Sequence, residues 1–184
     1  MINSKSTGFL SFSILFALAL VQQAVVLAQN PAPTNGSGLV TTRQFARIPA
    51  KAKVMAEPLY GQRPLTAECY ARLNSSKEYN ILFGNESKKS ATHWELFTLP
   101  KSGLLYAYLP GCQPDHVRTT VNVTDGKWHH LALVLEEQRA RLFADGKLAD
   151  ELAFTRRNGE RVAGSLVIGS LDGGGSGCDG EIAF

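Results

Sequence analysis

Several features that would point directly to a function are scarce or missing in this chain of 184 residues. No stretch keeps the apolar spacing of an amphipathic helix, which argues against a helical fold. The net charge of +3 is small and dispersed, and no basic stripe is interleaved with aromatics, so nucleic acid is not an expected partner. A nucleophile elbow, a phosphate-binding P-loop and a haem-attachment motif are all missing. These absences argue against several enzyme classes but do not identify a ligand.

What the sequence does contain is a series of short apolar-rich runs separated by Gly, Pro, Asn and Asp. Short strands punctuated in this way are typical of a β-sandwich or barrel. The length fits one domain with a real core. We therefore predict an all-β fold, with strands at residues 54–56, 65–73, 80–83, 93–99, 104–109, 117–123, 128–136, 139–144 and 147–154.

The segment 125–154 carries the clearest structural signal. Asp145-Gly146 separates the apolar-rich runs 139–144 and 147–154. Asp-Gly tolerates positive φ and closes tight hairpins, so consecutive runs should fold back on each other. The segment predicts an antiparallel meander of three strands.

The same segment carries a family resemblance. The pattern D-G-x-W-H-H-x-A begins at Asp125, and R-L-F-x-D-G-K begins at Arg141. With the runs 65–73, 165–170 and 180–184 in the expected order, the chain resembles laminin G-like modules of the concanavalin A-like superfamily. The resemblance implies an antiparallel two-sheet jelly-roll β-sandwich over residues 50–184. Two departures are Tyr70, where the family commonly has Trp, and the end at Phe184, within what resembles the last strand.

The resemblance implies a non-catalytic binding or adhesion module that recognises carbohydrate or an extracellular protein. A structural accessory domain of a larger surface protein is the first alternative. A glycoside hydrolase fragment is the second. Because the last strand looks incomplete, we expect the chain to be truncated and its unpaired sheet edge to favour association.

The N-terminus predicts export. Lys5 precedes a nearly continuous apolar run at residues 9–20, and small residues stand before a cleavage point at Ala28. This pattern is typical of a signal peptide at residues 1–28. A membrane anchor is the alternative, but Gln22-Gln23 interrupts the run before it reaches spanning length. Residues 29–49 then read as a flexible linker, and the mature protein would be secreted, periplasmic or on the cell surface, without a membrane span.

Three cysteines in an exported protein raise the question of pairing. Cys69 lies in a strand alternation that points it to the core, where a free thiol packs as a small apolar group. Cys112 and Cys178 both lie in turn-rich segments and could meet at one end of the sandwich. We expect a Cys112–Cys178 disulfide or two further free thiols, since geometry decides between them.

Candidate catalytic and metal residues are few. The neighbours His129 and His130 should point to opposite faces of a strand, so they predict no shared metal ion. The acidic pairs 136–137 and 150–151 are also neighbours. A glycosidase needs two carboxyl groups about 5 to 10 Å apart across the scissile bond. We therefore assign no catalytic residue and no metal ligand.

Calcium is the cofactor that the resemblance implies. It requires several oxygen ligands, which loops at one end of a sheet can supply. Asp172 and Asp179 lie in a glycine-rich loop, and Asp125 and Asp145 lie in other turns. Aspartates also serve Asp-Gly turns, and we favour that role here. No calcium ligand is assigned.

Aromatic residues recur in two of the expected strands, at Trp94, Phe97, Tyr106 and Tyr108. Sugars stack on such rings when the rings face solvent. Aromatics at these positions more often fill a sandwich core, and we favour that interpretation.

Overall fold

The computed structural model describes residues 52–54, 58–171 and 176–183, and these residues form a β-sandwich. The predicted signal peptide at 1–28, the linker at 29–49 and Phe184 lie outside them, as do Asp172 and three of the glycines that follow it. Within the described part, the only helix is a short 3-10 turn, η2 (Pro58–Gly61). None of the helices in the described residues is long and apolar enough to cross a membrane.

Two sheets make up the sandwich, and all neighbouring strands are antiparallel. The larger sheet has six strands, in the order β1 (Ala52–Val54), β12 (Leu166–Ile168), β3 (Asn80–Asn85), β4 (Trp94–Thr98), β5 (Leu104–Tyr108) and β7 (His116–Asn122).

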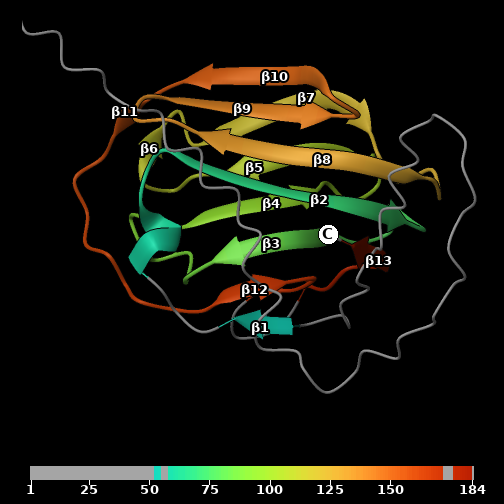
Figure 1. Ribbon diagram of the computed structural model, residues 1–184, viewed down its shortest axis with the longest axis horizontal. Coiled ribbons are helices and arrows are strands. Elements are labelled where there is room, and N and C mark those ends of the chain that lie inside the picture. The colour runs from blue at the N-terminus through green and yellow to red at the C-terminus, as the bar shows by residue number, and fades with distance from the viewer. Residues whose placement is uncertain (1–51, 55–57, 172–175, 184) are drawn as a thin grey trace, which may run out of the picture.

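The second sheet has five strands, in the order β10 (Lys147–Ala153), β9 (Arg139–Ala144), β8 (Trp128–Leu135), β2 (Leu65–Leu73) and β13 (Gly180–Ala183). A small third sheet pairs β6 (Cys112–Gln113) with β11 (Thr155–Arg156). Figure 1 shows the five-stranded sheet nearer the viewer, with the six-stranded sheet behind it. The prediction of an antiparallel two-sheet sandwich is confirmed.

The predicted meander is formed by β8, β9 and β10. Asp145 and Gly146 both have positive φ, at 52° and 75°, which is the conformation that a two-residue hairpin turn requires. The bounds predicted for β2 and β9 coincide with those of the structure. The short strands β6 and β11 were not predicted, because two-residue runs carry no detectable alternation.

The core lies between the two sheets and follows strand alternation. On β2 the inward side chains, beginning with Leu65 and ending with Leu73, alternate with more exposed ones. Leu131, Leu133 and Leu135 of β8 fill the same layer. From the other sheet come Trp94, Leu96, Leu105 and Ala107. Because inward residues of β4 and β5 are committed to this layer, the residues between them must point outward.

Some buried apolar side chains lie outside this core layer. Ile81 and Phe97 are only 1% and 6% exposed, yet they do not belong to the core cluster. They are partners across the β3–β4 ladder and so lie on the same outer face of the six-stranded sheet. That outer face is therefore unusually apolar for a sandwich surface.

Candidate ligand-binding face

The outer side of β4, β5 and β7 presents two rows of side chains, fixed by cross-strand register. Phe97 pairs with Tyr106, and Tyr106 pairs with Arg118. In the next row Glu95 pairs with Tyr108, and Tyr108 pairs with His116. Direct partners in an antiparallel sheet lie on one face, with Cβ atoms about 5 Å apart. We call these six residues the aromatic face; it lies on the side turned away from the viewer in Figure 1.

The rings on this face contact one another. The centroids of Phe97 and Tyr106 are 6.1 Å apart in an edge-on arrangement, and those of Tyr108 and His116 are 4.6 Å apart. Tyr79, which is 42% exposed, extends the first row, with its centroid 5.9 Å from that of Phe97. Tyr106 and Tyr108 are half-buried rather than enclosed. The result is a pair of adjacent, partly exposed ring platforms.

A buried carboxylate, that of Glu95, lies beside Tyr108 in the second row. Glu95 is 2% exposed, and its Oε2 lies 3.1 Å from Lys88 Nζ and 3.4 Å from His93 Nε2. His93 Nδ1 donates to the carbonyl oxygen of Asn85 at 2.6 Å, because a carbonyl can only accept. Lys88 also lies over the ring of Tyr108, 5.6 Å from its centroid. The position of the Glu95 carboxylate is therefore fixed by two neighbours.

The prediction that the aromatics of these strands fill the core is right for Trp94 and wrong for Tyr106 and Tyr108. Trp94 is 1% exposed and belongs to the core, where its Nε1 donates to the carbonyl oxygen of Tyr60 at 2.7 Å. Tyr106 and Tyr108 lie on the outer side instead. Successive side chains of a strand point to opposite faces of the sheet, so the face that each aromatic occupies depends on the register of its strand.

The two adjacent histidines point in different directions, as predicted. His129 lies between two turn carboxylates, with Nδ1 2.8 Å from Asp145 and Nε2 2.9 Å from Asp125. His130 lies against Glu68 on the outer side of the five-stranded sheet, 3.3 Å away. The contact of His129 with both aspartates was not predicted, because the two Asp-Gly turns come together only in the folded chain.

The titration of these groups follows from their contacts. Burial lowers the pKa of His129, but hydrogen bonds to Asp145 and Asp125, and their charges, outweigh it, so the net pKa is raised. The hydrogen bond from His129 and the backbone N–H of Lys127 lower the pKa of Asp125 to about 2. Burial opposes the change at Asp145, yet the same histidine lowers that pKa as well. The three groups form a rim clamp in which charged imidazole and carboxylates stabilise one another.

The aspartates considered for calcium do not gather around an empty centre. Asp125 and Asp145 meet around the imidazole just described. Asp179 accepts hydrogen bonds from Ser75 and Asn74 at 2.7 and 3.3 Å. In the described ranges, no group of three or more His, Cys, Asp or Glu side chains is arranged to hold a metal ion. These carboxylates do not fit a shared calcium site, and a dependence on calcium stays a prediction.

Of the two alternatives for Cys112 and Cys178, a disulfide or two free thiols, the structure has the free thiols. The thiol of Cys112 lies 3.4 Å from the guanidinium of Arg63, before the start of β2. Cys178 precedes β13, which pairs with the far end of β2 at Leu73. A nine-residue strand spans about 26 Å, whereas a disulfide tolerates a Cα separation of at most about 7 Å.

The other thiol behaves as predicted. Cys69 faces the core and is 2% exposed. Burial, with smaller contributions from Cys178 and Glu68, raises the pKa of Cys69 well above its usual value. Burial and the charge of Asp179 raise the pKa of Cys178 to about 12. Since the thiolate is the reactive form, both groups are poor nucleophiles at neutral pH.

The adjacent acidic residues Glu136 and Glu137 lie in the turn between β8 and β9 and contact different partners. Glu136 contacts Arg141 at 2.5 Å, and Glu137 contacts Arg156 at 3.4 Å. Each carboxylate therefore has its own cationic partner, and the two do not face a common substrate position.

Comparisons with known proteins agree with the fold. No curated protein matches the chain in sequence. The carbohydrate-binding module CBM40 of the Ruminococcus gnavus IT-sialidase is similar in structure, with a TM-score of 0.54, 12% identity, and coverage of 77% of this chain and 90% of that module. The same module bound to alpha2,3 sialyllactose gives a TM-score of 0.53 at 12% identity, covering 77% and 88% of the two chains.

Domains LG4-5 of the mouse laminin alpha1 chain are less similar, with a TM-score of 0.48, 15% identity, and coverage of 76% of this chain and 39% of that one. Sequence comparison identifies the family directly, since residues 49–184 match the laminin G model described as the Concanavalin A-like lectin/glucanases superfamily. The chain therefore belongs to the laminin G-like family of the concanavalin A-like lectin/glucanase superfamily.

Proposed function

We propose that this domain is a non-catalytic, exported glycan-binding module and that its ligand lies across the aromatic face. The observation that carries the proposal is the position of Tyr106 and Tyr108, which are half-buried on the outer side of the sheet. A sugar ring has an apolar face of C–H groups that packs on an aromatic ring and a rim of hydroxyls that needs hydrogen-bond partners. Tyrosine offers both a ring and a polar tip.

The neighbours of the two tyrosines supply further polar groups. The ammonium of Lys88, whose side chain is 52% exposed, lies beside Tyr108 and is held there by the buried carboxylate of Glu95. His116 stacks on the same ring, and its Nδ1 lies 2.7 Å from Asp115. A few fixed polar groups around an apolar platform are the usual composition of a small-ligand site. The likeness to a CBM40 module that was solved bound to alpha2,3 sialyllactose supports a glycan as the ligand class.

The non-catalytic part of the proposal rests on carboxylate placement. A glycosidase needs two carboxyl groups across the scissile bond. On the aromatic face Glu95 is engaged by Lys88 and His93, and Asp115 is engaged by His116. Neither carboxyl group is free to act as an acid or a nucleophile opposite the other.

The test is binding to a panel of oligosaccharides that includes sialyllactose and lactose, measured by calorimetry. Tyr106→Ala and Tyr108→Ala should each weaken binding about tenfold or more, because each removes a platform. Tyr70→Ala is the matched control, since Tyr70 is a half-buried tyrosine on the outer side of the other sheet. Melting temperatures verify folding, and chromatography of each mixture verifies that no sugar is cleaved.

If all three alanine variants weakened binding equally, the aromatic face would not be the site. Cleavage of any oligosaccharide would overturn the non-catalytic proposal. Binding to an extracellular protein with no binding to any sugar would replace a glycan with a protein as the ligand.

A further inference from the structure

Arg118 differs from the other arginines in the described part of the chain in the contacts that its guanidinium group makes. Five of them contact a carboxylate, namely Arg72, Arg139, Arg141, Arg156 and Arg161. Arg63 and Arg157 contact neutral acceptors. Arg118 instead makes a hydrogen bond through its backbone N–H, which donates to the carboxylate of Asp150 at 3.3 Å. Its guanidinium, with five N–H donors, has no protein partner among these residues.

This unused guanidinium belongs to the aromatic face. Arg118 is the direct cross-strand partner of Tyr106, so the two side chains leave the sheet on the same side, with Cβ atoms about 5 Å apart. Arg118 is exposed, and Tyr106 is half-buried beside it. A ligand lying on the Tyr106 ring would have its edge within reach of the guanidinium.

The remaining charges of the face are already compensated. Lys88 is paired with Glu95 at 3.1 Å, and His116 is paired with Asp115 at 2.7 Å. Arg118 is thus the charged residue of the aromatic face whose charged group has no ion-pair partner in the described part of the chain; the carboxylate of Asp150 nearby accepts from its backbone N–H. An exposed arginine always remains hydrated, so the distinguishing observation is its position next to a stacking platform.

We propose that Arg118 determines specificity by selecting glycans that carry an anionic group, a carboxylate or a sulfate, at the edge of the sugar stacked on Tyr106. The inference rests on the proposed function, because it assigns a ligand class to the same face. The guanidinium fork matches a carboxylate or sulfate with two parallel hydrogen bonds. A neutral sugar offers hydroxyls alone, which gain less from a charged donor.

The test uses matched pairs of probes that differ only in charge. One pair is an oligogalacturonate and its methyl ester, and the other is a chondroitin sulfate oligosaccharide and its desulfated form. The wild-type chain should bind the more anionic member of at least one pair about tenfold or more tightly. Preference in the first pair alone identifies a carboxylate, and preference in the second alone identifies a sulfate.

Arg118→Gln should bring the ratio of the affinities for the two members of a pair close to one, because glutamine keeps hydrogen-bonding groups but carries no charge. Arg118→Lys should give an intermediate value, because lysine keeps the charge but loses the fork. Arg139→Gln is the control, since it makes the same charge change on the other sheet, where Arg139 contacts Glu151 at 3.6 Å. Higher salt should reduce the preference of the wild-type chain and of Arg118→Lys, because both carry a positive charge at this position.

The outcomes separate the inference from the proposed function. Equal affinity for both members of each pair, or equal loss in the Arg118→Gln and Arg139→Gln variants, would overturn the role of Arg118. If Tyr106→Ala still weakened binding in that case, glycan binding at the aromatic face would stand. If no oligosaccharide bound at all, the proposed function would fall, and the role of Arg118 with it.

Discussion

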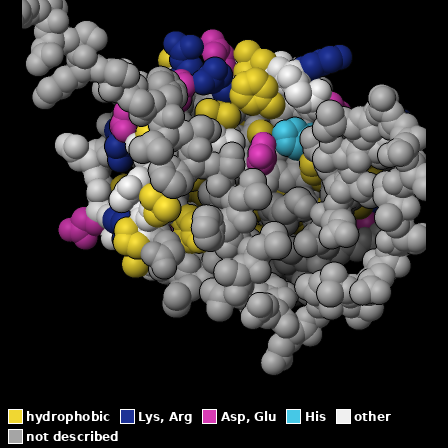
Figure 2. All heavy atoms as spheres, in the orientation of Figure 1, with side chains coloured by type: hydrophobic (Ala, Val, Ile, Leu, Met, Phe, Trp, Pro, Cys, Tyr) yellow, Lys and Arg dark blue, Asp and Glu magenta, His cyan; other side chains and the backbone are white. Residues whose placement is uncertain are grey.

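The outer faces of the two sheets are built by the same strand alternation and yet differ in what they leave free. On the five-stranded sheet several charged side chains pair with each other. Glu68 contacts His130 at 3.3 Å, and Arg72 contacts Glu181 at 2.7 Å. Figure 2 shows this side with basic, acidic and hydrophobic side chains intermixed. It is a surface whose charges are largely satisfied internally.

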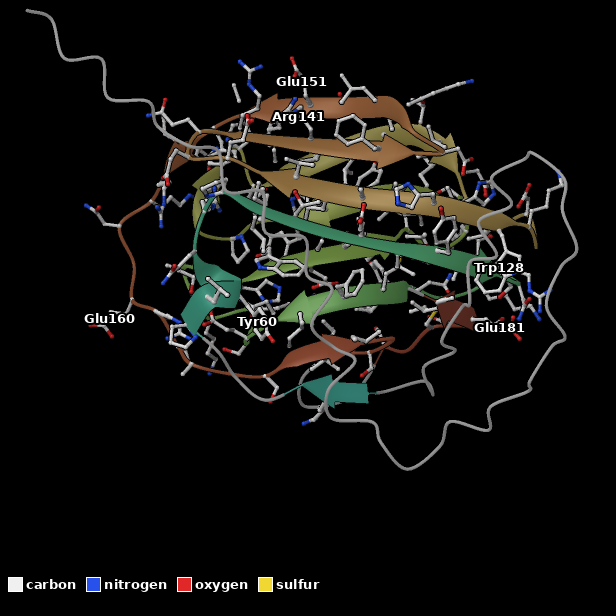
Figure 3. All side chains as sticks on the ribbon, in the orientation of Figure 1. Tyr60, Trp128, Arg141, Glu151, Glu160 and Glu181 are labelled. Carbon is white, nitrogen blue, oxygen red and sulfur yellow. The ribbon has the colours of Figure 1, made fainter. Side chains whose placement is uncertain are left out.

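Figure 3 labels four side chains of the five-stranded sheet. Trp128 and Glu181 lie together at one end, and Arg141 and Glu151, which are cross-strand partners, lie at the β9–β10 side. The six-stranded sheet instead carries contiguous rings and the unpaired guanidinium of Arg118. The comparison teaches that cross-strand register, rather than composition, decides which face can receive a ligand, because register chooses the neighbour of each side chain.

The largest expected effect comes from substituting the two buried aromatics of β4, which point to opposite sides. Trp94→Ala should destabilise the fold by about 3–5 kcal/mol, because it opens a cavity in the core. Phe97→Ala should cost less stability but weaken glycan binding, since Phe97 supports the Tyr106 ring from the outer side. Urea unfolding and calorimetry measure the two effects. If Phe97→Ala destabilised the fold as much as Trp94→Ala and left glycan binding unchanged, Phe97 would have a role in stability alone.

A smaller effect is expected at the rim clamp, through pH. Because the folded-state pKa of His129 is raised above its usual 6.5, the stability it contributes is fully present below about pH 6.5 and is lost as pH rises through the folded pKa. The lowered pKa values of Asp125 and Asp145 contribute stability that is present above about pH 4 and is lost on acidification.

The melting temperature should therefore be highest between about pH 4 and pH 6.5 and decline toward pH 8. His129→Gln should remove the decline on the alkaline side, because glutamine does not titrate. His116→Gln is the comparison variant, since His116 lies on the other sheet with a single carboxylate partner. A wild-type melting temperature that rises from pH 6 to pH 8 would contradict the clamp.

The smallest effect is expected for an exposed ion pair on the outer side of the five-stranded sheet. Arg139 and Glu151 are 54% and 49% exposed and 3.6 Å apart. Such pairs contribute less than about 1 kcal/mol, so a double-mutant cycle with alanine should give a coupling energy near zero. Glycan affinity should not change either. A coupling of several kcal/mol would show that the charges of this face do more than neutralise each other.

Much of the fold was predictable from local sequence. The alternation from Leu65 to Leu73 predicted β2 and the inward position of Cys69, and Asp145-Gly146 predicted the hairpin between β9 and β10. Each of these signals is contained within a few neighbouring residues. The adjacency of His129 and His130 in one strand also predicted that they point to different sides, because successive side chains of a strand alternate between its faces.

The candidate site was less predictable. The aromatics were visible in the sequence, but their parity was misjudged for Tyr106 and Tyr108. The choice between a Cys112–Cys178 disulfide and free thiols stayed open at the sequence level for the same kind of reason, since the proximity of two turns depends on which end of β2 each one reaches. A one-residue change in register or a different strand end reverses such an assignment.

The sequence by itself determined the elements, which are short strands and the glycine turns between them, because these depend on neighbours along the chain. Only the tertiary structure decided that Tyr106 has Phe97 on one side and Arg118 on the other. That arrangement joins β4, β5 and β7, and hydrogen-bonded strand pairing fixes such cross-strand contacts in a way that no local pattern specifies.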